Sequence, residues 1–195
     1  DRQSSAAGID RKMTSANRDY WDAVVEEWTA NQRQALWRRH SDAVNSELLR
    51  RWLPSHRVAR LLKTDLFDEA VSIGLYSLLA ECADQLVGVD LSPGILEAAK
   101  RRFPDLESCA ADVRELPFDD ASFDVIVSNP PYIPDDEWGD VAPNVKDHEP
   151  EMALRGGPDG LRFVRPLLEH APGLLAPGGM LLIEIAASRA DEVLR

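Results

Sequence analysis

The stretch FDVIVSNPPY, residues 123–132, is an apolar run that ends in Asn-Pro-Pro-Tyr. The run is typical of a buried strand. A residue before proline is pushed out of the helical region, so we expect Asn129 and Pro130 to be extended and the bend to be stiff. Such a bend brings the Asn129 amide, the Pro130 carbonyl and the Tyr132 ring together at the carboxyl end of the strand. This arrangement suits a planar NH2 group; the alternative is an ordinary turn that ends a strand.

Around this stretch, short apolar runs alternate with helical stretches from residue 57 onward. We expect strands over 57–64, 85–90, 106–110, 123–128 and 180–186, the last after the turn at 177–179. Helices are expected over 74–82, from Ser92-Pro93 onward, and over 160–175. Strands separated by helices predict an α/β, Rossmann-like fold with a doubly wound, mostly parallel sheet. Ligands of such a sheet bind outside the carboxyl ends of its strands.

Two further parts precede this region. Residues 1–18 are polar, and we expect a disordered arm. Residues 19–56 are expected to form an N-terminal helical segment, either a cap over the active site or a pair of amphipathic helices on one face of the core. Helical spacing of apolar residues carries this prediction: Trp21, Val24, Val25 and Trp28, then Val44, Leu48, Leu49 and Trp52.

The composition restricts the partners. The formal charge is -12, from 22 basic and 34 acidic residues, and the basic clusters are short. Long duplex nucleic acid is therefore an unexpected partner, whereas a protein acceptor or a small molecule suits this charge. The chain has no apolar run of membrane-spanning length and no signal-like start, so we expect a cytoplasmic protein without a membrane partner. Cys82 and Cys109 lack the spacing of a disulfide framework or a zinc site, and we expect both to be buried in a reducing compartment and no metal to be bound.

Acidic residues follow three of the predicted strands: Asp65, Asp90 and Asp112. An acid at the tip of the second strand can accept hydrogen bonds from both hydroxyls of a ribose. Asp112 can accept one from an adenine amino group, with Val113 or Leu116 against the ring. Together the three predict a nucleoside pocket, although each alone is equally typical of a turn or a helix cap.

These acids and their neighbours, including the runs 111–118 and 122–126, resemble the class I S-adenosylmethionine-dependent methyltransferases over roughly residues 57–186. The resemblance implies S-adenosylmethionine as cofactor, with Asp65 near its methionine end, Asp90 on its ribose and Asp112 on its adenine. Members usually carry Gly-x-Gly-x-Gly after the first acid, whereas DLFDEAVSIG, residues 65–74, has only Gly74, and Phe67 stands where a side chain crowds the ligand. The cofactor-binding residues implied are Asp65, Gly74, Asp90, Leu91, Asp112, Val113 and Asn129.

Beyond the fourth strand the likeness changes subgroup. NPPYIP at 129–134, EPEMAL at 149–154 and GGPDGL at 156–161 closely resemble the HemK/PrmC-type glutamine methyltransferases of release factors. The upstream half is more similar to general small-molecule methyltransferases, which indicates a chimera or a divergent hybrid joined near Ser128. A complete domain of this family continues through two more strands. We therefore expect the methyltransferase domain, residues 57–195, to be C-terminally incomplete, with its fifth strand at an edge.

The resemblance implies methyl transfer to a planar NH2 group, first of all a protein glutamine side-chain amide of a release factor. Asn129, Pro130 and Tyr132 are the expected catalytic residues, because the two oxygens can each accept one N–H while the ring stacks on the amide plane. Pro131 and Glu149 join them in acceptor binding, and residues 130–158 are expected to be an irregular acceptor-binding lid. The alternatives are an adenine amino-group methyltransferase, a small-molecule methyltransferase, and a catalytically silent binding module.

Overall fold

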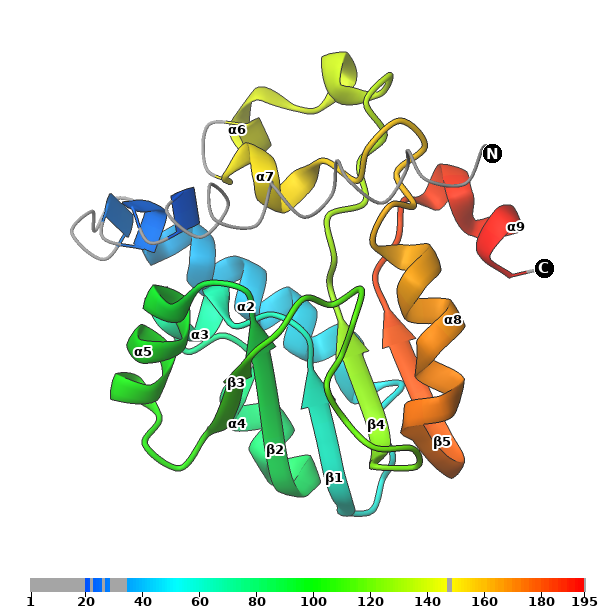
Figure 1. Ribbon diagram of the computed structural model, residues 1–195. Helices are drawn as coiled ribbons and strands as arrows, with labels where there is room; N and C mark the ends of the chain where they lie inside the picture. Colours follow the sequence, from blue (N-terminus) through cyan, green and yellow to red (C-terminus); the bar gives the residue numbers. More distant parts are fainter. Residues whose placement is uncertain (1–19, 22, 26, 29–34, 147–148, 195) are drawn as a thin grey trace, which may run out of the picture.

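A five-stranded parallel sheet organises the chain. The computed structural model describes residues 20–21, 23–25, 27–28, 35–146 and 149–194, so the predicted arm over 1–18 lies outside the described residues. The strand order is β3-β2-β1-β4-β5, and the order reverses between β1 and β4 (Figure 1). The predicted doubly wound α/β fold is confirmed. The strands are β1 (Val58–Lys63), β2 (Ala83–Asp90), β3 (Glu107–Ala110), β4 (Phe123–Ser128) and β5 (Leu175–Ile183).

Helices connect these strands and cover the sheet. The described residues between 20 and 28 are helical. Within the described ranges, none of the helices combines the length and the apolar character needed to cross a membrane. The other helices are α2 (Ala35–Arg50), α3 (Phe67–Val71), α4 (Tyr76–Cys82), α5 (Pro93–Arg102), η2 (Trp138–Asp140), α6 (Pro143–Lys146), α7 (Glu151–Leu154), α8 (Val164–Leu174), η3 (Ala187–Arg189) and α9 (Ala190–Val193).

Both faces of the sheet are buried, because adjacent residues of a strand point to opposite sides. Leu61 packs with Leu79 of α4 on one face, and Leu62 packs with Leu167 of α8 on the other. All four leucines are fully buried. Two apolar layers against one sheet explain why the strands are nearly continuous apolar runs. The cysteines at the margins of these layers, Cys82 and Cys109, are half-buried rather than buried as expected.

The fifth strand starts earlier than expected. We predicted a start at Met180, after the turn at 177–179, but β5 begins at Leu175. Leu175 pairs with Phe123 and Met180 pairs with Val125, so the intervening residues bulge out of the ladder. Gly178 makes this bulge possible with φ of 83°. The expected turn residues are therefore an insertion within the strand.

Two other segments differ from the prediction. The stretch from 130 to 158 contains the short helices η2, α6 and α7, which lie over the carboxyl ends of the strands (Figure 1). The helix expected over 160–175 begins only at Val164. The preceding residues form turns instead, because Gly160 has a positive φ of 75°.

The N-terminal segment packs on the core only in part as the helical spacing of its apolar residues predicts. Trp21, Val24, Val25 and Trp28 pack against a buried cluster that includes Phe67, as helical spacing predicts. The second set does lie in or just after the helix α2, as its spacing predicts, but it does not form an apolar face toward the core: Val44, Leu48 and Trp52 are 44%, 48% and 66% exposed, and of the four only Leu49 packs on the core. Polar contacts set the inner face of α2, since Asp42 accepts hydrogen bonds from Ser72 Oγ at 2.5 Å and from the Gly74 N–H at 3.3 Å.

Candidate active site

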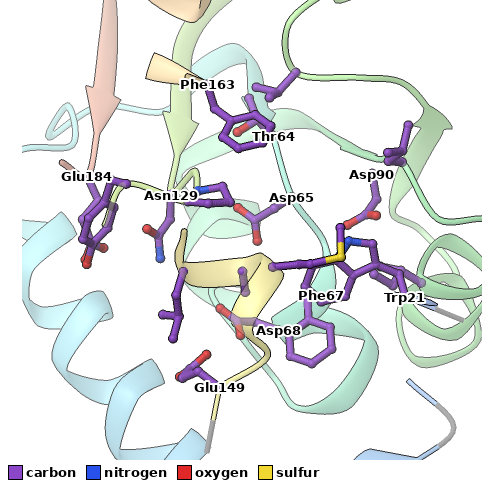
Figure 2. A pocket seen from close by; sticks show the side chains of 18 of the residues that line it. Trp21, Thr64, Asp65, Phe67, Asp68, Asp90, Asn129, Glu149, Phe163 and Glu184 are labelled. Carbon is purple, nitrogen blue, oxygen red and sulfur yellow. The ribbon is translucent and has the colours of Figure 1, made fainter. Parts of the chain in front are cut away.

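A cavity of about 350 Å³ lies where the strands end (Figure 2). Residues that follow all five strands line it, together with side chains from α2 and α7. This is the edge where parallel α/β sheets bind ligands, next to the reversal of strand order. The predicted residues that line the cavity are Asp65, Asp90, Leu91, Asp112, Val113, Asn129, Pro131, Tyr132 and Glu149.

Two predicted site residues lie elsewhere. Pro130 is buried and is not among the lining residues of the cavity. Gly74 lies at the junction of α3 and α4, also outside the lining, with a positive φ of 56°. A Cβ at Gly74 would come within 2.5 Å of Glu69 Oε1, so its missing side chain serves the packing of Glu69.

Asp90 ends β2 and is almost completely buried, with an exposed fraction of 9%. Its Oδ2 accepts the Leu66 N–H at 3.0 Å, and its Oδ1 accepts the Ser92 N–H at 2.9 Å. Burial raises the pKa of Asp90 to about 6, although both hydrogen bonds favour the ionised form. Each oxygen keeps further acceptor capacity, as binding to ribose hydroxyls requires.

Asp112 is held by the neighbouring Arg114. The Arg114 Nε and terminal nitrogen donate to its carboxylate at 3.0 Å and 2.7 Å, and the Arg114 backbone N–H donates at 2.9 Å. Burial alone would raise the pKa of Asp112, but these contacts outweigh it and the pKa is lowered. Asp112 is therefore a fixed anion at the cavity wall, where Arg114 also lies over the ring of Phe163 at 5.9 Å.

A short helix, α3, occupies the place where a glycine loop is usual after β1. Lys63, at the end of β1, bonds Asp65 Oδ1 at 2.8 Å and Glu69 Oε2 at 2.9 Å. Glu69 is buried and also accepts the Leu75 N–H at 2.9 Å, at the start of α4. Burial raises the pKa of Glu69 to about 7 despite the Lys63 charge. This pair fixes the turn, and Phe67 packs on Trp21 and Trp28 with an exposed fraction of only 8%.

The Asn-Pro-Pro-Tyr bend is braced at both of its ends. Beneath it, Thr64 Oγ1 bonds Ser128 Oγ at 2.7 Å, which joins the tips of β1 and β4. Tyr132 Oη donates to Glu184 Oε1 at 2.6 Å, just beyond β5. Burial and the Glu184 charge raise the pKa of Tyr132 well above its usual value, so Tyr132 is a neutral donor. Asn129 is exposed to the cavity, near Asp65 and Glu184 in Figure 2.

The glycine motif after α7 packs directly on this bend. Gly156 donates to the Ile133 carbonyl at 2.9 Å, and Ile133 donates to the Leu154 carbonyl at 2.8 Å. A Cβ at Gly160 would come within 2.4 Å of the Tyr132 carbonyl oxygen. Close backbone approach thus requires glycine at 160, and the motif supports the bend in addition to forming turns.

Trp138 belongs to the internal packing of the 130–158 segment. Lys146 Nζ lies 5.3 Å and the Arg155 guanidinium 5.5 Å from its ring centroid. Arg155 also pairs with Asp135 at 2.7 Å and Glu151 at 2.6 Å. These contacts anchor η2 to α6 and α7.

The cavity carries a strongly negative lining. Six carboxylates and two guanidinium groups line it: Asp65, Asp68, Asp90, Asp112, Glu149 and Glu184 against Arg38 and Arg114. Such a field favours a cationic ligand, and apolar side chains such as Val113 and Phe163 offer surface for a flat ring. The volume, the carboxylates at the strand tips and the apolar wall fit a nucleoside joined to a sulfonium ion.

Several lining residues were missed by sequence reasoning. Glu184 follows β5, which ends at Ile183, but the expected strand over 180–186 included Glu184, so the acid was not recognised at a strand tip. Arg38 and Phe163 come from α2 and from the turn before α8, and nothing in their local sequence indicates a cavity. Their place depends on how distant elements pack.

Comparison with known proteins places the chain. Residues 70–148 match the model of a methyltransferase domain. The chain is 36% identical to the release factor glutamine methyltransferase of Geobacter sulfurreducens, over 80% of this chain and 55% of that protein. It is 31% identical to the Caulobacter vibrioides protein of the same name, over 89% of this chain and 60% of that protein. The chain thus spans little more than half the length of these curated relatives.

The fold has solved counterparts. A phosphoethanolamine N-methyltransferase from Haemonchus contortus, in complex with phosphoethanolamine and S-adenosylhomocysteine, superposes with a TM-score of 0.56. The sequences are 16% identical, and the match covers 90% of this chain and 33% of that one. This likeness concerns the fold alone. The sequence matches and this fold together support a class I S-adenosylmethionine-dependent methyltransferase.

Proposed function

We propose that this chain transfers a methyl group from S-adenosylmethionine to a planar NH2 group, the side-chain amide of a protein glutamine. One observation carries the proposal: Asn129, Pro131 and Tyr132 line the same cavity as Asp65, Asp90 and Asp112. The amide-binding bend and the nucleoside-binding acids therefore face a common space. The release factor glutamine methyltransferases among the relatives support a release factor as the acceptor protein.

S-adenosylmethionine, the cofactor of this family, supplies an electrophilic methyl group. In this chain, Asp65 would lie near its methionine end, Asp90 would accept from its ribose and Asp112 from its adenine. Leu91 and Val113 would contact the nucleoside, and the excess of carboxylates over guanidinium groups in the lining would attract the positive charge of the sulfonium. Phe67 is also among the lining residues, so we expect moderate affinity for the cofactor.

The acceptor nitrogen is a poor nucleophile, because its lone pair is delocalised into the carbonyl, so positioning must supply much of the rate. The Asn129 side-chain oxygen, which lines the cavity, would accept one N–H of the acceptor amide, and the backbone carbonyl of the adjacent, buried Pro130 would accept the other. Tyr132, held by Glu184, offers a ring of fixed orientation for the amide plane. The new C–N bond forms as the bond between the methyl carbon and the sulfonium sulfur breaks, which would leave S-adenosylhomocysteine, a neutral thioether, as the leaving group. The two oxygens would stabilise the positive charge that develops on the nitrogen, which then releases one proton to solvent.

The acceptor is a protein in this proposal for a reason of charge. With a formal charge of -12, the chain favours a basic acceptor surface over duplex DNA. The segment over 130–158, with Glu149 at its cavity side, is the proposed acceptor-binding surface. Both cysteines are free thiols, which supports the cytoplasm as the compartment.

Two measurements test the proposal. Calorimetry should detect the binding of S-adenosylmethionine. If no binding is found at a millimolar concentration of the cofactor, the alternative of a catalytically silent binding module is favoured. Radiolabelled cofactor, offered with a release factor and separately with DNA, should label the protein. Label on DNA alone would instead support the adenine amino group as the acceptor.

Asn129→Ala is the decisive variant. We expect it to abolish methyl transfer, because the acceptor amide loses one of its two oxygen partners, and to leave the cofactor dissociation constant within about twofold, since Asn129 is one of many lining residues. Unchanged turnover would show that the bend is not the site.

A further inference from the structure

Arg38 of α2 is a buried cation at the wall of the cavity. It is 6% exposed, and its Nε is buried without a hydrogen-bond partner among the described residues. Burying a guanidinium group is unfavourable unless charged partners compensate it. Its contacts must therefore account for its position.

Two carboxylates from distant segments supply that compensation. One terminal nitrogen of Arg38 bonds Asp68 Oδ1 in α3, and the other bonds Glu149 Oε2 at 2.7 Å. Both acids line the cavity, and Figure 2 shows them on the same side of it. Asp68 belongs to the helix that replaces a glycine loop, whereas Glu149 belongs to the proposed acceptor-binding segment. One guanidinium group thus joins α2, α3 and the segment that leads into α7.

Two aromatic rings fix the plane of this group. The Arg38 guanidinium lies 4.9 Å from the Trp28 centroid and 5.3 Å from that of Phe67, and the two rings contact each other at 5.1 Å. A planar fork held in this way can bond two carboxylates at once, whereas a lysine ammonium on a flexible stem is a point charge without that geometry.

We propose that Arg38 is a positioning residue of the methyl-transfer site and that α2 thereby completes the site. Its single charge compensates Asp68 and Glu149 in part, so a sulfonium is attracted more to the carboxylates of Asp65 and Asp90. It also sets the distance between the cofactor side and the acceptor side of the cavity. This inference rests on the proposed function, and it assigns the N-terminal segment to the active site itself.

The test measures S-adenosylmethionine binding by calorimetry, which needs no acceptor. We expect Arg38→Gln to weaken binding by about tenfold or more, the effect of one lost charged hydrogen bond. Arg38→Lys restores the charge and should fall between Arg38→Gln and the wild type. Intrinsic tryptophan emission should shift in both variants, because Trp28 loses its stacked guanidinium. All measurements are made at a temperature where circular dichroism shows each variant to be folded.

Arg60→Gln is the matched control. Arg60 is half-buried, whereas Arg38 is buried, but it too lies over an aromatic ring, 4.8 Å from the Phe123 centroid, and it does not line the cavity. Its variant should bind the ligand within about twofold of the wild type. If the wild type binds and Arg38→Gln binds equally well, the role of Arg38 is refuted while the proposed function stands. If Arg60→Gln weakens ligand binding as much as Arg38→Gln does, Arg38 only stabilises the fold in general and has no specific role in the site. If the wild type does not bind the ligand, both the role of Arg38 and the proposed function are refuted.

Discussion

Single side chains in this site are oriented by partners from other strands. Tyr132 follows β4, and its hydroxyl donates to Glu184, beyond β5, at 2.6 Å. The bend itself holds the Tyr132 backbone, whereas Glu184 fixes the ring. The stacking surface proposed for the acceptor amide therefore depends on two adjacent parallel strands.

This dependence predicts the behaviour of two variants. Tyr132→Phe and Glu184→Gln should each lower kcat by roughly tenfold, the worth of a charged hydrogen bond, with little change in cofactor affinity. The double variant should be no worse than the singles, because both remove the same contact. Steady-state kinetics on the acceptor protein measure this. Tyr76→Phe is the control, since its ring stacks on Phe103 away from the cavity, and additive losses would contradict the coupling.

The raised pKa of Asp90 predicts how cofactor binding depends on pH. Burial raises its pKa to about 6, and hydrogen bonds from a ribose would favour the ionised form. The affinity should therefore be constant above neutral pH and should fall as the pH drops through 6, by at most about tenfold per pH unit. Calorimetry between pH 5 and 8 measures it. Asp90→Asn should bind weakly with no pH dependence in this range, and a persistent dependence would assign the titration to another group.

At the scale of elements, α3 is the distinctive feature. An ion pair between Lys63 and Glu69 at 2.9 Å, buried under this helix, supports the turn that glycines usually form. Gly74 is needed where the helix ends, because its φ is 56° and Glu69 occupies the space of a side chain. Glu69 cannot move aside, since Lys63 and the Leu75 N–H both hold it.

Gly74→Ala should therefore destabilise the protein by about 1–3 kcal/mol in urea unfolding, through backbone strain and the contact with Glu69. Gly139→Ala offers the matched control in η2, because nothing lies within 4 Å of its added Cβ and its φ is negative. That variant should change the stability by no more than about 0.5 kcal/mol. Equal effects at both positions would show that Glu69 does not restrict the turn.

Element boundaries show where local sequence suffices. The fourth strand was predicted at its observed limits. Its apolar run stops directly before Asn-Pro, and the restricted backbone there marks the end of the strand in the local sequence. Ser92 caps α5 as expected, accepting the Ile95 N–H at 3.2 Å. The short helix α3 was missed, since its stability comes from the buried Lys63 and Glu69 and from Phe67 packed on two tryptophans.

At the scale of the whole molecule, ligand binding should stabilise the fold, because residues from five strand tips, α2 and α7 meet in one cavity. S-adenosylhomocysteine at about 100 times its dissociation constant adds roughly 2.7 kcal/mol and should raise Tm by about 5–10 °C for a chain of this size. Thermal unfolding with increasing ligand measures the shift. Adenosine at the same concentration is the control for non-specific effects, and a concentration-independent Tm would contradict binding in this cavity.

The sequence by itself determined the strands, their parallel arrangement and the acids at their tips, because apolar periodicity, proline and turn chemistry act over a few residues. It also determined that Asn129 and Tyr132 end a buried strand. Only the tertiary structure decided which groups meet these residues: Arg38 with Glu149, Tyr132 with Glu184, and Gly160 with the Tyr132 carbonyl. These partners lie 28 to 111 positions apart, and their contacts arise from packing of whole elements, which local patterns do not encode.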